Sequence, residues 1–139
     1  MGADLPASRY VRILVYGVDR VAQCAQPVKE LQAELQTLAY PDGWTIGVVC
    51  TPVAWESLLK IADPPPTQAA FTNFIRHSTV VNAAIFRLRR SQYRHTLAHE
   101  LAHVVCQCKD ENTAEQMARS LERTPPSLPM RQTAKAALK

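Results

Sequence analysis

The residues best suited to chemistry are two histidines and a glutamate in the pattern His-Glu-x-x-His, at His99, Glu100 and His103. On an α-helix, residues four apart lie on one face, about 6 Å apart along the axis. Two imidazoles at this spacing can converge on one ion, and zinc binds such nitrogens at about 2.0–2.1 Å. Glu100 is one position further round the helix, where its carboxylate can reach a metal-activated water and act as its base. The pattern predicts a zinc site that hydrolyses an unreactive bond. Chance alone would place a His-Glu-x-x-His pattern in about half a per cent of chains of this composition.

A catalytic zinc ion also needs a third protein ligand and an open position. No histidine follows His103, which leaves a carboxylate, and Asp110, Glu111 and Glu115 are nearby. We favour Glu115, because it would lie in the first turn of the last helix and could point back across a short loop. Glu111 is the alternative ligand. The alternative role for Glu115 is a helix-capping box with Asn112.

Two further side chains on the same helix are not expected to bind the ion. His95 continues the helix face of His99 and His103, but the eight residues from His95 to His103 span about 12 Å, too far for one ion. We therefore expect His95 to support the site or to lie on the surface. Cys106 lies about 10 Å along the helix from His99, so a kink would be needed to make it a ligand.

The elements that must position this site follow from the hydrophobic pattern. The pattern predicts strands at 10–17, 44–50 and 79–86, helices at 19–39, 51–62, 91–106 and 112–123, and a segment at 69–76 that is ambiguous between strand and helix. The histidine pattern falls within the helix expected at 91–106. We predict one α+β domain over 1–123 and a flexible basic tail over 124–139, which could fold over the site.

Composition limits the class of protein. The 139 residues are 47% hydrophobic and 20% charged, which is typical of a globular domain. No apolar run reaches the ~18 residues of a membrane span, and the first ten residues lack the pattern of a secretory signal, so a cytoplasmic protein is expected. The net charge of +4 is a mild excess, and aromatic residues are not interleaved with the arginines, so nucleic acid is not an expected partner.

The four cysteines are Cys24, Cys50, Cys106 and Cys108, and none forms a Cys-x-x-Cys pair. A zinc ribbon or a thioredoxin-type redox site is therefore not indicated. In a cytoplasmic protein, reduced thiols are the expectation. A disulfide between Cys106 and Cys108, only two positions apart, is not expected.

The run Arg94–His103, R-H-T-L-A-H-E-L-A-H, is similar to the R-F-T-L-A-H-E-L-G-H run of ImmA/IrrE-type peptidases, members of the gluzincin clan of zinc metallopeptidases. The run Glu115–Leu121 resembles that family's E-x-x-A-N-x-F helix, and the small size resembles the minigluzincins. The resemblance covers about residues 79–121. It implies that His99 and His103 bind Zn²⁺ with Glu115, and that Glu100 is the general base. It also implies a zincin-like domain, whose mixed, mostly parallel sheet has an antiparallel edge strand and packs on the active-site helix.

The resemblance further implies a substrate cleft. In zincins an edge strand before the active-site helix holds an extended peptide by strand addition. The segment 69–76 occupies that place, and Phe71, Asn73 and Phe74 are its candidate substrate-binding residues, with ordinary sheet packing as their alternative role. The repressor substrates of the ImmA/IrrE-type peptidases make a transcriptional repressor a candidate partner.

The sequence thus predicts a zinc-dependent endopeptidase that acts on a protein or peptide. The alternative is a zinc-binding regulatory or protein-interaction module with little or no proteolytic activity. A nuclease of the small three-histidine type would need a further histidine after His103, and the chain has none.

Overall fold

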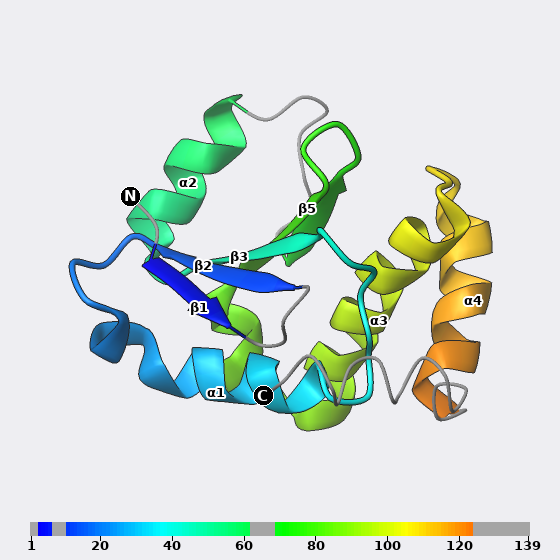
Figure 1. Cartoon of the computed structure of the whole chain (residues 1–139), viewed down its shortest axis with the longest axis horizontal. Coiled ribbons are helices and arrows are strands. Elements are labelled where there is room, and N and C mark those ends of the chain that lie inside the picture. Colours follow the sequence, from blue (N-terminus) through cyan, green and yellow to red (C-terminus); the bar gives the residue numbers. More distant parts are fainter. Residues whose placement is uncertain (1–2, 7–10, 62–68, 124–139) are drawn as a thin grey trace.

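A five-stranded mixed sheet with helices on both faces forms the centre of the computed structural model, which describes residues 3–6, 11–61 and 69–123 (Figure 1). The strands are β1 (Ala3–Pro6), β2 (Arg12–Tyr16), β3 (Thr45–Val49), β4 (Ala70–Asn73) and β5 (Ser78–Asn82). The α-helices are α1 (Ala25–Glu34), α2 (Pro52–Ile61), α3 (Arg90–Cys106) and α4 (Glu111–Arg123). Two 3₁₀ turns, η1 (Val21–Cys24) and η2 (Ala83–Arg87), precede α1 and α3. The predicted tail at 124–139 lies outside the described residues.

The strand order across the sheet is β1-β2-β3-β5-β4. The three central strands β2, β3 and β5 are parallel, and both edge strands run antiparallel to their neighbours. The predicted α+β class and mixed sheet are confirmed, with an antiparallel strand at each edge rather than at one. The ambiguous segment at 69–76 contains β4. The strand predicted at 79–86 ends at Asn82, because the Asn82 side chain accepts a hydrogen bond from the backbone of Ala84 and starts η2.

The hydrophobic core fixes α3 beneath the sheet. Alternate residues of β2 and β5 are buried, whereas β3 at the middle of the sheet is buried on both faces from Ile46 to Val49. Leu97 and Leu101 of α3 and Leu31 of α1 belong to the same buried cluster. Burial of each such side chain contributes about 1.5–3 kcal/mol. Figure 1 shows α1 and α3 on one side of the sheet, α2 on the other, and α4 beside α3.

A buried ion pair attaches the start of α3 to the end of α1. The Glu34 carboxylate is 1% exposed and accepts hydrogen bonds from Arg94 at 2.6 Å and from Arg90 at 2.7 Å. The Tyr93 hydroxyl donates to Glu30, one turn earlier on α1, at 2.7 Å. These contacts set the position of α3 relative to α1, and therefore the position of the histidine pattern on α3.

The turn after α3 corrects one prediction. Cys106 and Cys108 form a disulfide, whereas the prediction from the sequence was that they would not. Gln107 between them adopts the left-handed conformation, with φ of 53°, which ends α3 and brings the two Cα atoms to 5.2 Å. That separation lies within the range of about 4.4–6.8 Å that disulfides require.

A second disulfide joins Cys24 at the start of α1 to Cys50 after β3. All four cysteines are therefore paired, and the expectation of reduced thiols is wrong for this structure. Within the part of the chain that the structure describes, no helix combines the length and the apolar composition of a membrane span.

Candidate metal centre

Helices α3 and α4 face each other through a ladder of histidine and glutamate side chains. The helices run antiparallel and are joined by the short loop 107–110, so residues late in α3 lie opposite residues early in α4. The pairs along the ladder are His103 with Glu111, His99 with Glu111 and Glu115, and His95 with Glu115 and Glu122. Both helices also contribute fully buried alanines to the hydrophobic core, namely Ala98, Ala102, Ala114 and Ala118.

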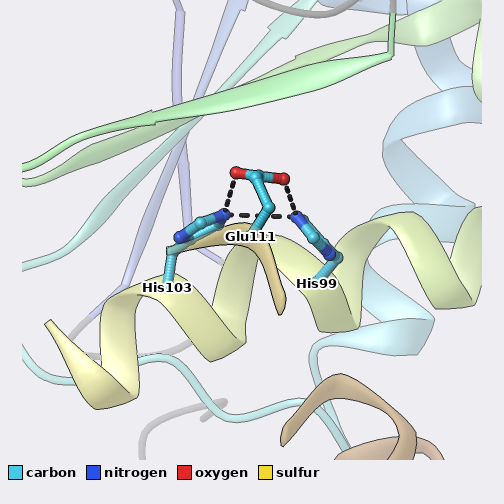
Figure 2. A group of neighbouring side chains, drawn as sticks. All are labelled: His99, His103 and Glu111. Atoms are coloured by element: carbon cyan, nitrogen blue, oxygen red, sulfur yellow. Dashed lines mark hydrogen bonds and ion pairs between the residues drawn. The ribbon is translucent and has the colours of Figure 1, made fainter. Parts of the chain in front are cut away.

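Three donor atoms converge at one end of this ladder (Figure 2). The Nε2 atoms of His99 and His103 lie 3.2 Å apart. The Glu111 carboxylate places one oxygen 2.9 Å from His99 Nε2 and the other 2.9 Å from His103 Nε2. Donor atoms of these three side chains all lie within 4.8 Å of one another. His99, His103 and Glu111 thus form a group that could hold a metal ion.

In both imidazole rings, the Nδ1 atom makes a contact that orients the ring. His103 donates from Nδ1 to the backbone carbonyl of Cys108 at 2.8 Å, and Nδ1 of His99 lies 2.9 Å from the Glu115 carboxylate. A hydrogen bond of this kind places the proton on Nδ1 and leaves the Nε2 lone pair free for a metal. The arrangement therefore directs both lone pairs to the same point.

The donor set fits zinc. Two imidazole nitrogens with one carboxylate is a common protein ligand set for a catalytic zinc ion. Ligands at ~2.0–2.1 Å in tetrahedral arrangement lie about 3.3 Å apart, close to the 3.2 Å between the two Nε2 atoms. Only modest shifts of these side chains would be needed to place an ion among them. Three protein ligands also leave a fourth position for water or substrate.

Glu111, rather than the predicted Glu115, lies beside both Nε2 atoms. The reason is where α4 begins. Asp110 caps the helix by accepting hydrogen bonds from the backbone and hydroxyl of Thr113, so Glu111 is the first helical residue and lies opposite His103. Glu115 lies one turn further along α4, where it contacts Nδ1 of His99 and Nε2 of His95. Asp110 thus occupies the cap position that the alternative capping box had given to Asn112.

Electrostatics within the ladder favour charged partners. Burial disfavours the protonated form of His99, but the Glu115 hydrogen bond and the neighbouring carboxylates together raise the pKa of His99. The hydrogen bond to His99 lowers the pKa of Glu115. The Glu122 hydrogen bond raises the pKa of His95. Without metal, the carboxylates of the ladder thus favour the protonated forms of His95 and His99, and metal binding at His99 would displace the proton of a protonated ring.

Glu100 extends from α3 to the underside of β4. Its side chain is 6% exposed, and its carboxylate accepts a hydrogen bond from the Thr72 hydroxyl at 2.7 Å. Burial raises the pKa of Glu100, while the Thr72 hydrogen bond and the nearby His103 and His99 act in the opposite direction. A raised pKa brings this carboxylate closer to the range that suits a general base near neutral pH.

The predicted substrate-binding residues have packing contacts of their own. Phe71 lies against Trp55 of α2, with ring centroids 6.2 Å apart, on the face of β4 opposite Thr72. Asn73 accepts a hydrogen bond from the backbone of Arg76 in the turn after β4, and Phe74 packs edge-on against Trp44. None of these contacts joins the three side chains to the metal-ligand group, and their substrate role stays a prediction.

Sequence reasoning missed two groups at the site, the Thr72 hydroxyl and the Cys108 carbonyl. Thr72 precedes Glu100 by 28 residues, and nothing in a strand pattern identifies which residue will face a helix so distant in the chain. The Cys108 carbonyl depends on the left-handed turn at Gln107. Tyr93 and Arg94, which precede the histidine pattern on α3, pair with Glu30 and Glu34 of α1.

Comparisons with known proteins identify no relative: no protein-family model, no curated protein and no solved structure matches the chain.

Proposed function

We propose that this chain is a zinc-dependent endopeptidase, with His99, His103 and Glu111 as the metal ligands and Glu100 as the general base. The proposal rests on the orientation of the two imidazole rings. Nδ1 of His103 contacts the Cys108 carbonyl and Nδ1 of His99 contacts Glu115, while both Nε2 atoms contact Glu111. A pair of histidines used only to join two helices would not need both Nε2 atoms directed at one point.

In the proposed reaction the metal ion and Glu100 have separate roles. When bound, a zinc ion supplies Lewis acidity, which lowers the pKa of water to about 7 and polarises a carbonyl. Glu100 accepts the proton of the attacking water and then passes it to the leaving nitrogen. Its buried position supports this role, because few waters compete for its carboxylate.

The substrate side of the proposal depends on β4. This strand is at the end of the sheet and lies over α3, with Thr72 in contact with Glu100. An extended peptide that paired with an edge strand in this position would pass close to the base and the metal ligands. We therefore propose a protein or peptide substrate in extended conformation, with a transcriptional repressor as one candidate.

The test pairs metal analysis with a cleavage assay on the full chain. Wild-type protein should bind one zinc ion and hydrolyse an unfolded protein or a quenched peptide library. Glu100→Gln should keep stoichiometric zinc and lose cleavage by about 10²-fold or more. His99→Ala and His103→Ala should lose the metal. The matched control is Glu56→Gln on the exposed surface of α2, which should change neither property.

Two outcomes would contradict the proposal in different ways. Stoichiometric zinc in His99→Ala would show that the ligand assignment is wrong. Stoichiometric zinc in the wild type, without cleavage of any substrate tested, would favour the zinc-binding regulatory or interaction module instead.

A further inference from the structure

A chain of hydrogen bonds runs from the hydrophobic core to Glu100. The Trp44 indole N–H donates to the Thr79 hydroxyl at 3.2 Å, and the hydroxyls of Thr79 and Thr72 are 3.1 Å apart. The Thr72 hydroxyl then lies 2.7 Å from Oε1 of Glu100. The two threonines are directly paired across the antiparallel strands β4 and β5.

The chemistry of the two ends sets the direction of the protons. An indole N–H can only donate, and an ionised carboxylate can only accept. Thr79 therefore accepts from Trp44, and its own proton is left for the Thr72 oxygen or the Tyr40 oxygen. The Thr72 proton is donated to the Glu100 carboxylate, which can only accept.

The surroundings shield this series of hydrogen bonds from water. Thr79 is fully buried, and Trp44 and Glu100 are 8% and 6% exposed, so water does not compete freely for these groups. Tyr40 also hydrogen bonds with Thr79 and donates its hydroxyl to the carbonyl of Leu97. Burial raises the pKa of Tyr40, so this neighbour is neutral. Glu100 is thus the carboxylate at which this series of hydrogen bonds ends.

We propose that Thr72 is a positioning residue for the general base: its hydroxyl, oriented by Thr79 and Trp44, holds one oxygen of Glu100 and so directs the other oxygen towards the reacting water. This inference rests on the proposed function, because Glu100 has a base role only in a hydrolase. A base must lie within hydrogen-bond distance of the proton it takes, and a displacement of about 1 Å can cost 10²-fold in rate. A carboxylate on a flexible side chain needs such a fixed contact.

The test compares Thr72→Val, which keeps the shape but removes the hydroxyl, with Thr72→Ser, which keeps the hydroxyl. Thr72→Val should lower kcat on the order of 10²-fold, with KM and zinc content unchanged. Thr72→Ser should stay within about threefold of wild type. Thr96→Val, which removes a hydroxyl bonded to the Gln92 carbonyl on α3, is the matched control and should leave kcat unchanged.

Readouts independent of activity separate this inference from the proposed function. In crystal structures of the metal-free variants, the Glu100 carboxylate should rotate away in Thr72→Val and keep its wild-type position in Thr72→Ser. Thr79→Val removes the hydroxyl that contacts both Trp44 and Thr72. In this variant the Trp44 indole N–H resonance should shift, and kcat should fall less than in Thr72→Val. If Thr72→Val does not fold, Thr72→Ala removes the same hydroxyl and is compared with Thr72→Ser instead.

An unchanged Glu100 position in Thr72→Val, or equal impairment of the valine and serine variants, would overturn the positioning role. A wild-type protein without peptidase activity would refute the proposed function, and the crystallographic comparison would still decide whether Thr72 fixes Glu100.

Discussion

The carboxylate of Glu115 lies 2.9 Å from Nδ1 of His99, whereas the carboxylate of Glu111 lies 2.9 Å from Nε2 of the same ring. The two glutamates therefore contact opposite nitrogens of one histidine. Groups that hold the distal nitrogen of a metal-bound histidine orient the ring and increase its basicity. Glu111 and Glu115 are thus expected to differ in what they contribute to metal binding.

Substitution of the two glutamates should separate these contributions. Glu111→Ala should lose stoichiometric zinc, because it removes a proposed ligand. Glu115→Gln should keep the metal with an affinity about 10–100-fold lower, because it removes only the charged partner of Nδ1. Competition with a chromophoric chelator measures both affinities. The reverse result, with the metal retained in Glu111→Ala and lost in Glu115→Gln, would favour the ligand assignment predicted from the sequence.

The position of the histidines could be predicted because their spacing and the helix that carries them are local properties of the sequence. The helix expected at 91–106 is present as α3, and His99 and His103 meet on one face as the pattern requires. Which of Glu111 and Glu115 lies beside the two Nε2 atoms is not a local property of the sequence. It depended on where α4 begins, which is determined by the Asp110 cap and the left-handed Gln107.

The rest of the site depends on long-range pairing. Thr72 reaches Glu100 only because β4 pairs with β5 in one particular register, with Thr72 opposite Thr79. A shift of one residue would turn Phe71 or Asn73 towards α3 instead. Sequence pattern identifies a short strand but does not fix its register, so neither the Thr72 contact nor the packing of Phe71 on Trp55 could be predicted.

The histidine–glutamate ladder predicts a pH dependence for the metal-free protein. The pKa of His95 is raised above its ordinary value of about 6.5 by Glu122 and Glu115. Its stabilising contribution is fully present below the unfolded-state pKa and is lost as pH rises through the raised folded-state pKa. The free energy of unfolding should therefore fall as pH rises from about 6 towards the raised pKa.

Urea denaturation at a series of pH values, in the presence of a chelator, measures this effect. His95→Gln should reduce the slope without abolishing it, because His99 also has a raised pKa. A slope identical to that of wild type in His95→Gln would show that the ion pairs of His95 do not contribute to stability.

The buried carboxylate of Glu34 should be important for stability. Glu34→Ala removes the partner of Arg94, whose side chain is 17% exposed, and of Arg90. Breaking a buried ion pair by removing one partner costs about 3–5 kcal/mol. Chemical denaturation should show a loss of this size, whereas Glu56→Ala on the exposed surface of α2 should stay within about 0.5 kcal/mol of wild type. A loss below 1 kcal/mol in Glu34→Ala, about the value of an exposed pair, would contradict this role.

The disulfide between Cys106 and Cys108 should influence the metal site through His103. Its ring encloses the left-handed Gln107 and fixes the Cys108 carbonyl that accepts the hydrogen bond from Nδ1 of His103. Reduction, or the double variant Cys106→Ser with Cys108→Ser, should free this turn and lower zinc affinity about 10–100-fold, as does the loss of other groups that orient metal-bound histidines.

The second disulfide provides the control for this experiment. Cys24→Ser with Cys50→Ser removes a bond between α1 and the end of β3, so it should lower the free energy of unfolding and leave zinc affinity unchanged. Chelator competition under oxidising and reducing conditions measures the affinities, and thiol labelling with mass spectrometry counts the bonds present. Equal zinc affinities for the oxidised wild type and the Cys106/Cys108 double variant would show that His103 holds its orientation without this disulfide.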